Sequence, residues 1–214
     1  LSTDGDIVSF RKGGSTVGSI GTLTADPYIA RANGCGVRFI TAAYIPSNAT
    51  GNNNGDAVDL GHPSIRFKDA YLSGGVYLGG TGAANKLDDY ETGSFTPTMS
   101  GGYSVSAYSI QYGTYTKIGN TVRAYFRVSL QTSSTTASQV IISGLPFTAV
   151  GSQYTTGTSY INYSSANGDS VKPLVFPNSA SVYLYYQSTT GVSGLVGTNL
   201  GPNLDILGQV VYQV

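Results

Sequence analysis

The segment from Asp59 to Pro97 constrains the fold of this chain most; it reads DLGHPSIRFKDAYLSGGVYLGGTGAANKLDDYETGSFTP. Its glycines are too frequent for a domain that packs alone, yet apolar residues recur along it. Apolar surface left in water is unfavourable, so these residues need a partner surface. Because the segment cannot supply that surface itself, we expect burial against copies of the same segment, at a junction between a stem and a head.

Local patterns in this junction predict only short elements. Val76–Leu78 fits a three-residue strand, and Ala83–Tyr90 is the one plausible short helix, ended by Gly93. A helix of this length is not stable alone in water, so its neighbours must hold it in place.

The composition changes near Pro97. Residues 96–214 contain 12 of the 17 Tyr, but only four of the 11 Lys and Arg and two of the 11 acidic residues. We therefore place a domain boundary at this point. Residues 1–96 are expected to form a fibre-like shaft with its junction, and residues 97–214 a C-terminal head.

The head has the pattern of an antiparallel β domain. Apolar and polar side chains alternate strictly through Val122–Leu130, which is typical of a half-buried strand. Together with Ser109–Lys117 it predicts a hairpin around Ile118–Thr121, and Ala180–Gln187 alternates again. Six to eight such strands predict a β-sandwich or jelly roll.

The first part of the chain also predicts strands. Ile7–Phe10 and Thr16–Ile20 fit a hairpin, and Gly36–Ile45 fits one strand that Pro46 ends. A two-stranded hairpin is marginal in water, so this part needs a partner surface as well.

Charge and composition argue against several kinds of partner. The formal net charge is zero and Lys and Arg are not clustered, so we expect no nucleic-acid binding. No run approaches the roughly 20 apolar residues of a membrane span, so we expect no membrane insertion. Cys35 and His62 are the only residues of their types, which predicts no metal site within one chain and no cofactor.

The acidic residues and the histidine do not form a catalytic pattern. His62 lies in a Gly/Pro turn without a nucleophile motif, and the head has only Asp169 and Asp205 where glycoside hydrolysis needs two paired carboxylates. We expect no catalytic residues and no enzymatic activity. A site built between subunits is the alternative that stays open.

Tyrosine is the most function-like feature of the head, because its flat ring and polar tip suit sugars and protein epitopes. The residues that alternation places outward, and that we take as receptor-binding candidates, are Tyr125, Tyr183, Tyr185, Arg123 and Arg127. Packing of these tyrosines on a neighbouring chain or loop explains them at least as well, since Tyr is a good strand residue.

Several strings in the chain resemble one protein family. Asp59–Gly61, Arg66–Gly82 (RFKDAYLSGGVYLGGTG) and Asn85–Glu91 (NKLDDYE) resemble a segment of tail fibre proteins from tailed bacteriophages. Tyr115–Asn120 (YTKIGN) and Ser143–Phe147 (SGLPF) are similar to the C-terminal domains of the same proteins.

The resemblance implies a homotrimeric fibre tip, carried on the virion and extracellular, that recognises a glycan or protein on the host surface. Together with the strand patterns, it leads us to predict an all-β fold: an intertwined trimeric β shaft followed by an antiparallel, jelly-roll-like β-sandwich head. Since the chain begins at Leu1 rather than Met, we expect a missing N-terminal region that joins other virion tail proteins. The expected contacts between the three chains are Phe67, Tyr71, Leu72, Val76, Tyr77, Leu78 and Leu87.

Two other functions remain as alternatives. A tailspike would degrade polysaccharide, against which the few acidic residues of the head count. A virion decoration or adaptor protein would have no receptor role.

Overall fold

The computed structural model describes residues 3–55, 57–152, 154–162, 170–188 and 191–214. Its described regular structure consists of β-strands and two three-residue 3-10 turns, η1 (Ala83–Asn85) and η2 (Gly197–Asn199), which confirms the predicted all-β class. No helix in this described part is long and apolar enough to cross a membrane. The chain divides into two compact units, Leu1–Tyr71 and Leu72–Val214, and each is described by itself.

The N-terminal unit is a five-stranded antiparallel meander in chain order. Its strands are β1 (Gly5–Lys12), β2 (Ser15–Leu23), β3 (Asp26–Arg31), β4 (Cys35–Ile40) and β5 (Ala43–Asn48). The predicted hairpin is present as β1 and β2. Gly13 and Gly14 form its turn with φ of 57° and 84°, a conformation that favours glycine.

The predicted single strand over Gly36–Ile45 is wrong. The chain reverses at Thr41 and Ala42, so that Ile40 pairs with Ala43 and Phe39 pairs with Tyr44. The apolar run is therefore two strands that share one hairpin. Pro46 does not end the second of these strands but lies within β5, at the edge of the sheet, where a missing N–H is tolerated.

The two faces of this sheet differ. On one face Tyr28 is buried, and its hydroxyl donates a 2.7 Å hydrogen bond to Asp6. On the other face the register aligns an apolar row across all five strands, formed by Val8, Ile20, Ile29, Val37 and Pro46. Val8 is 44% exposed and Ile29 47%. The described residues of this unit therefore leave the apolar row partly open.

The junction holds one small hairpin. β6 (Val76–Tyr77) pairs with β7 (Lys86–Leu87), and Leu78 donates a backbone hydrogen bond of 2.8 Å to Asn85. The helix predicted over Ala83–Tyr90 is wrong. Only the 3-10 turn η1 (Ala83–Asn85) forms, because the next residues pair with β6 and Tyr90 already begins the following strand.

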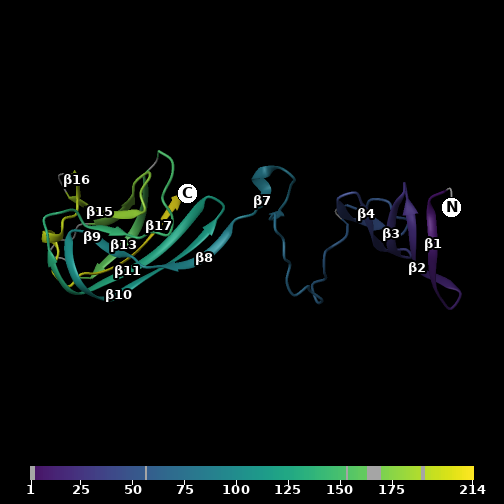
Figure 1. The fold of residues 1–214 in the computed structure, drawn as a ribbon, viewed down its shortest axis with the longest axis horizontal. Helices are drawn as coiled ribbons and strands as arrows, with labels where there is room; N and C mark the ends of the chain where they lie inside the picture. Colours follow the sequence, from purple (N-terminus) through teal and green to yellow (C-terminus); the bar gives the residue numbers. More distant parts are fainter. Residues whose placement is uncertain (1–2, 56, 153, 163–169, 189–190) are drawn as a thin grey trace. The chain divides into compact units, whose positions relative to one another are not determined.

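From here on we use the name head for strands β8 to β17, which include β8 on the N-terminal side of residue 97. They form one ten-stranded antiparallel sheet in the order β8-β10-β11-β17-β13-β14-β15-β12-β9, with β16 beside β15. Figure 1 shows its long strands β10 and β11 curving side by side. The bounds are β8 (Tyr90–Phe95), β9 (Thr98–Gly101), β10 (Tyr103–Ile118), β11 (Thr121–Thr135), β12 (Ile141–Ser143), β13 (Thr155–Asn162), β14 (Ser170–Val175), β15 (Ser181–Ser188), β16 (Gly191–Gly194) and β17 (Asp205–Gln213).

The sheet folds over at β13, whose first residues pair with β14 and whose later residues pair with β17. Its two halves enclose one core, in which Phe126 on β11, Leu184 on β15 and Ile206 on β17 are fully buried. Complete burial of such a side chain stabilises a fold by about 1.5–3 kcal/mol. The predicted alternation in β11 is confirmed, since Val122, Ala124, Phe126, Val128 and Leu130 all face this core.

Candidate ligand-binding face of the head

The same alternation sends the intervening side chains of β11 to the opposite side of the sheet. We call this side, on strands β8, β10, β11, β17 and β13, the outer face. Direct cross-strand pairs align a central row on it, with one residue from each strand: Ser94, Thr114, Tyr125, Gln209 and Thr158. Side chains paired in this way lie on one face, so the row is a continuous strip of hydroxyl and amide groups around one aromatic ring.

Two further rows flank the central row. One contains Thr92, Thr116, Arg123 and Val211, and the other contains Tyr112, Arg127, Leu207 and Tyr160. Tyr112 is 52% exposed and Tyr160 is 61% exposed. The outer face is therefore rich in Thr and Tyr, with one arginine in each flanking row.

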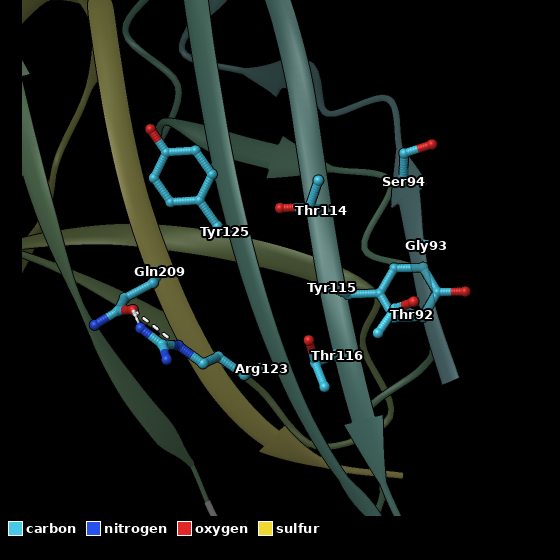
Figure 2. Close-up of a pocket in the computed structure, with 9 residues that line it drawn as sticks. All are labelled: Thr92, Gly93, Ser94, Thr114, Tyr115, Thr116, Arg123, Tyr125 and Gln209. Carbon is cyan, nitrogen blue, oxygen red and sulfur yellow. Dashed lines mark hydrogen bonds between the residues drawn. The ribbon is translucent and has the colours of Figure 1, made fainter. Parts of the chain in front are cut away.

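The outer face is hollowed on both sides of Tyr125. One depression of about 760 Å³ extends over β8, β10 and β11 and includes Thr114, Thr116 and Arg123 in its lining. A smaller one of about 270 Å³ extends over β17 and β13, and the two share Tyr125 and Gln209. Both are open to solvent, and the larger is within the usual size of ligand sites. Figure 2 shows the residues that line the larger depression, among them the ring of Tyr125 and the side chain of Arg123, which is hydrogen-bonded to Gln209.

The two arginines of the outer face differ in their partners. Arg123 donates from Nε at 3.2 Å and from Nη2 at 2.7 Å to Oε1 of Gln209, a neutral amide. Arg127 donates two bonds to the carboxylate of Asp205, at 3.1 and 2.8 Å, and Asp205 raises the pKa of Arg127. The charge of Arg127 is thus compensated within the chain. Among the described residues Arg123 has no ion-pair partner.

Near this face, the edge at β8 is held by polar contacts that the sequence did not predict. The hydroxyl of Tyr115 donates to the carboxylate of Glu91, which raises the pKa of that tyrosine. Its ring meets Phe147 edge-to-face at 5.3 Å, and Lys117 forms an ion pair with Asp89. The two polar contacts attach β8 and the residue before it to the long hairpin, and β8 in turn contributes part of the lining of the larger depression.

Of the five predicted receptor-binding residues, the structure brings Arg123, Tyr125 and Arg127 together on the outer face. Tyr183 and Tyr185 lie elsewhere, on β15, where both rings contact Phe176, at centroid distances of 4.6 and 6.3 Å. Both are half-buried. The packing explanation therefore accounts for these two tyrosines.

The predicted contacts between chains are all exposed in the single chain. Phe67, Tyr71, Leu72, Val76, Tyr77, Leu78 and Leu87 have at least 39% of their surface accessible. Leu60 and Ile65 of the same segment are exposed as well, at 90% and 76%. These apolar side chains between Leu60 and Leu87 thus lack cover from the described residues of their own chain.

The residues that were considered as metal ligands or catalytic groups do not come together in one site among the described residues. In the described ranges no group of three or more His, Cys, Asp or Glu could hold a metal ion. His62 lies in an exposed turn, where its Nδ1 accepts a 3.2 Å hydrogen bond from the backbone of Ser64. Asp205 is bonded to Arg127, and Asp169 lies outside the described residues.

Sequence reasoning missed the hydroxyl groups around Tyr125. The predicted hairpin turn already places Thr114 opposite Tyr125 and Thr116 opposite Arg123, so its register was the available signal. No local signal identifies Gln209, which is 86 residues away from Arg123 along the chain.

Comparison of the chain with protein-family models, with curated proteins and with solved structures finds no match.

Proposed function

We propose that this chain is the receptor-binding tip of a homotrimeric tail fibre of a tailed bacteriophage. In this role it is carried on the outside of the virion, joins other tail proteins, and binds a glycan or protein of the host surface without changing it chemically. The observation that carries the proposal is the run of exposed apolar side chains between Leu60 and Leu87.

Association of several copies of the chain would supply the apolar surface that these exposed side chains need in order to be buried. Burying apolar surface stabilises by about 25 cal/mol per Å², so several such side chains per chain provide a substantial driving force. The apolar row of the N-terminal sheet, from Val8 to Pro46, offers a second surface of the same kind. β1 is also exposed along its whole length and forms one edge of its sheet, where unpaired backbone groups can bind another strand.

A trimer also suits a receptor-binding role. Three heads present three copies of the outer face, and multivalent contact converts weak single-site binding into strong attachment. The resemblance of the junction strings to phage tail fibres supports this assignment, and the outer face of the head is a surface that can hold the receptor.

The experiment has two parts. Light scattering of the purified chain at micromolar concentration should give the mass of a trimer, and a well-folded monomer would contradict the assembly. Fluorescently labelled trimer should then bind intact host cells without releasing reducing ends from their capsule. Release of reducing ends would instead favour a tailspike. Normal incorporation into particles without cell binding would favour an adaptor.

A further inference from the structure

We infer that the outer face of the head binds an acidic glycan, a chain of sugars that carries carboxylate or phosphate groups, across its central row. The inference rests on the proposed receptor-binding role and names the chemical class of the receptor. Arg123 is assigned to the anionic group and Tyr125 to the flat face of a sugar ring. The hydroxyl groups of the central row are assigned to the sugar hydroxyls.

The charge of the outer face points to an anion. Arg127 is neutralised by Asp205, whereas the guanidinium of Arg123 is bonded only to the neutral amide of Gln209 among the described residues. That amide accepts hydrogen bonds from Nε and Nη2 and holds the guanidinium in place, while the two N–H groups of Nη1 have no partner among the described residues. A cation that is held in place but not neutralised is suited to charge-assisted bonds with a carboxylate or phosphate.

The surroundings of Arg123 point to a sugar. Tyr125 is 37% exposed and separates the two depressions, so its ring is accessible to a ligand that extends into both. Ser94, Thr114 and Thr158 lie in line with it, and each hydroxyl can both donate and accept hydrogen bonds. Sugar hydroxyls need partners that can do both.

The dimensions favour a chain over a single small molecule. Neighbouring strands lie about 4.8 Å apart, so the central row spans about 19 Å across five strands. Both depressions are shallow and open, which suits an extended ligand that stays partly in solvent. A protein partner would be expected to bury an apolar centre, but the central row of this face surrounds the single ring of Tyr125 with hydroxyl and amide groups.

The experiment measures binding of the trimeric full chain to immobilised probes at low and high salt. The probes are hyaluronan oligosaccharides for carboxylates, a ribitol-phosphate teichoic acid for phosphates, and chitohexaose as the neutral control. We expect at least one anionic probe to bind about tenfold or more tightly than chitohexaose, with binding that weakens as salt rises. The two anionic probes distinguish carboxylate from phosphate.

Arg123→Gln and Arg127→Gln form a matched pair on the same strand. Arg123→Gln should weaken binding of the anionic probe about tenfold or more, while Arg127→Gln should change it by less than about threefold. Tyr125→Ala should weaken the same binding to a similar extent as Arg123→Gln. Thermal melting and light scattering verify that each variant is folded and trimeric.

Several outcomes would overturn the inference. These are equal affinity for the neutral chain, absence of binding to both anionic probes, equal loss in the two arginine variants, or dissociation of the trimer by Arg123→Gln. The last outcome would make the outer face a contact between subunits. Failure of the glycan inference is distinguishable from failure of the receptor role. If host cells still bind the trimer after periodate oxidation of their sugars, the receptor is not a glycan but the receptor role stays intact. If untreated host cells do not bind the trimer, the receptor role itself is contradicted.

Discussion

The N-terminal sheet and the head are built from the same kinds of strand but differ in what they bury. In the head, Phe126, Leu184 and Ile206 are fully buried between the halves of one curled sheet. In the N-terminal sheet the buried hydrophobic residues are Tyr28 and Ala30, and the apolar row on the opposite face stays partly open. The head can therefore stabilise itself, whereas the N-terminal sheet needs a second surface.

The cause of this difference is connectivity. A five-stranded meander with short turns makes one layer, and one layer can shield only the face onto which its own loops fold. The head places β13 between two groups of strands, so that the sheet turns back over itself and both groups share a core. The proposed fibre would use both kinds of region, a shaft that depends on neighbouring chains and a head that folds by itself.

Removing one phenylalanine ring from each region should give the largest contrast, because one ring lies in a closed core and the other is half exposed. Phe126→Ala should lower the free energy of unfolding of the head by about 3–5 kcal/mol, because it leaves a cavity in a closed core. Phe10→Ala, at a ring that is 48% exposed on β1, should leave unfolding of the head unchanged. Urea unfolding followed by near-UV circular dichroism checks both variants. Equal losses would show that the two regions share one cooperative core.

An acidic side chain introduced on the exposed apolar surfaces tests whether the junction and the N-terminal sheet are covered by other copies of the chain. Leu78→Asp in the junction and Ile29→Asp in the apolar row should each disfavour association by about 3 kcal/mol per chain, since an unpaired charge would be buried between copies. Light scattering should show dissociation of the proposed trimer while the head keeps its melting temperature. Val192→Asp, at an exposed position on β16, is the matched control and should leave the trimer intact. An unchanged mass in either variant would exclude that residue from the shared interface.

Sequence patterns predicted the head better than the N-terminal part. The alternation in β11 was decisive, because each inward residue is apolar and each outward residue is polar or aromatic over nine positions. The run Gly36–Ile45 has no such period and no Gly or Pro at its reversal, so one strand and two strands look alike in the sequence. At Ala83–Tyr90 the composition suits a helix, but pairing of Lys86 and Leu87 with β6 overrides that local preference.

The candidate site could be predicted only in part, because some of its contacts depend on strands that are distant in the sequence. Alternation alone places Arg123 and Tyr125 outward, and the hairpin register adds Thr114 and Thr116. The contrast between Arg123 and Arg127 depends on β17, which supplies Gln209 to one and Asp205 to the other. Which distant strand lies beside β11 is a property of the whole fold, and no local pattern encodes it.

The smallest expected effect concerns alkaline pH and the closed core of the head. Burial raises the pKa of Tyr212 to about 12, from an ordinary value near 10. The unfolded chain therefore loses this proton at lower pH than the folded head does. The resulting stability is present below pH 10 and is lost as the pH rises from about 10 to about 12, by about 2 kcal/mol.

Urea unfolding of the head at pH 8, 10 and 11.5 measures this loss, and Tyr212→Phe is the control because it keeps the buried ring but removes the titrating group. The variant should lose less stability over this pH range than the unsubstituted chain. Burial also raises the pKa of Tyr103, so part of the loss should persist until both tyrosines are replaced. An identical pH dependence in the double variant would mean that the alkaline sensitivity arises outside the closed core.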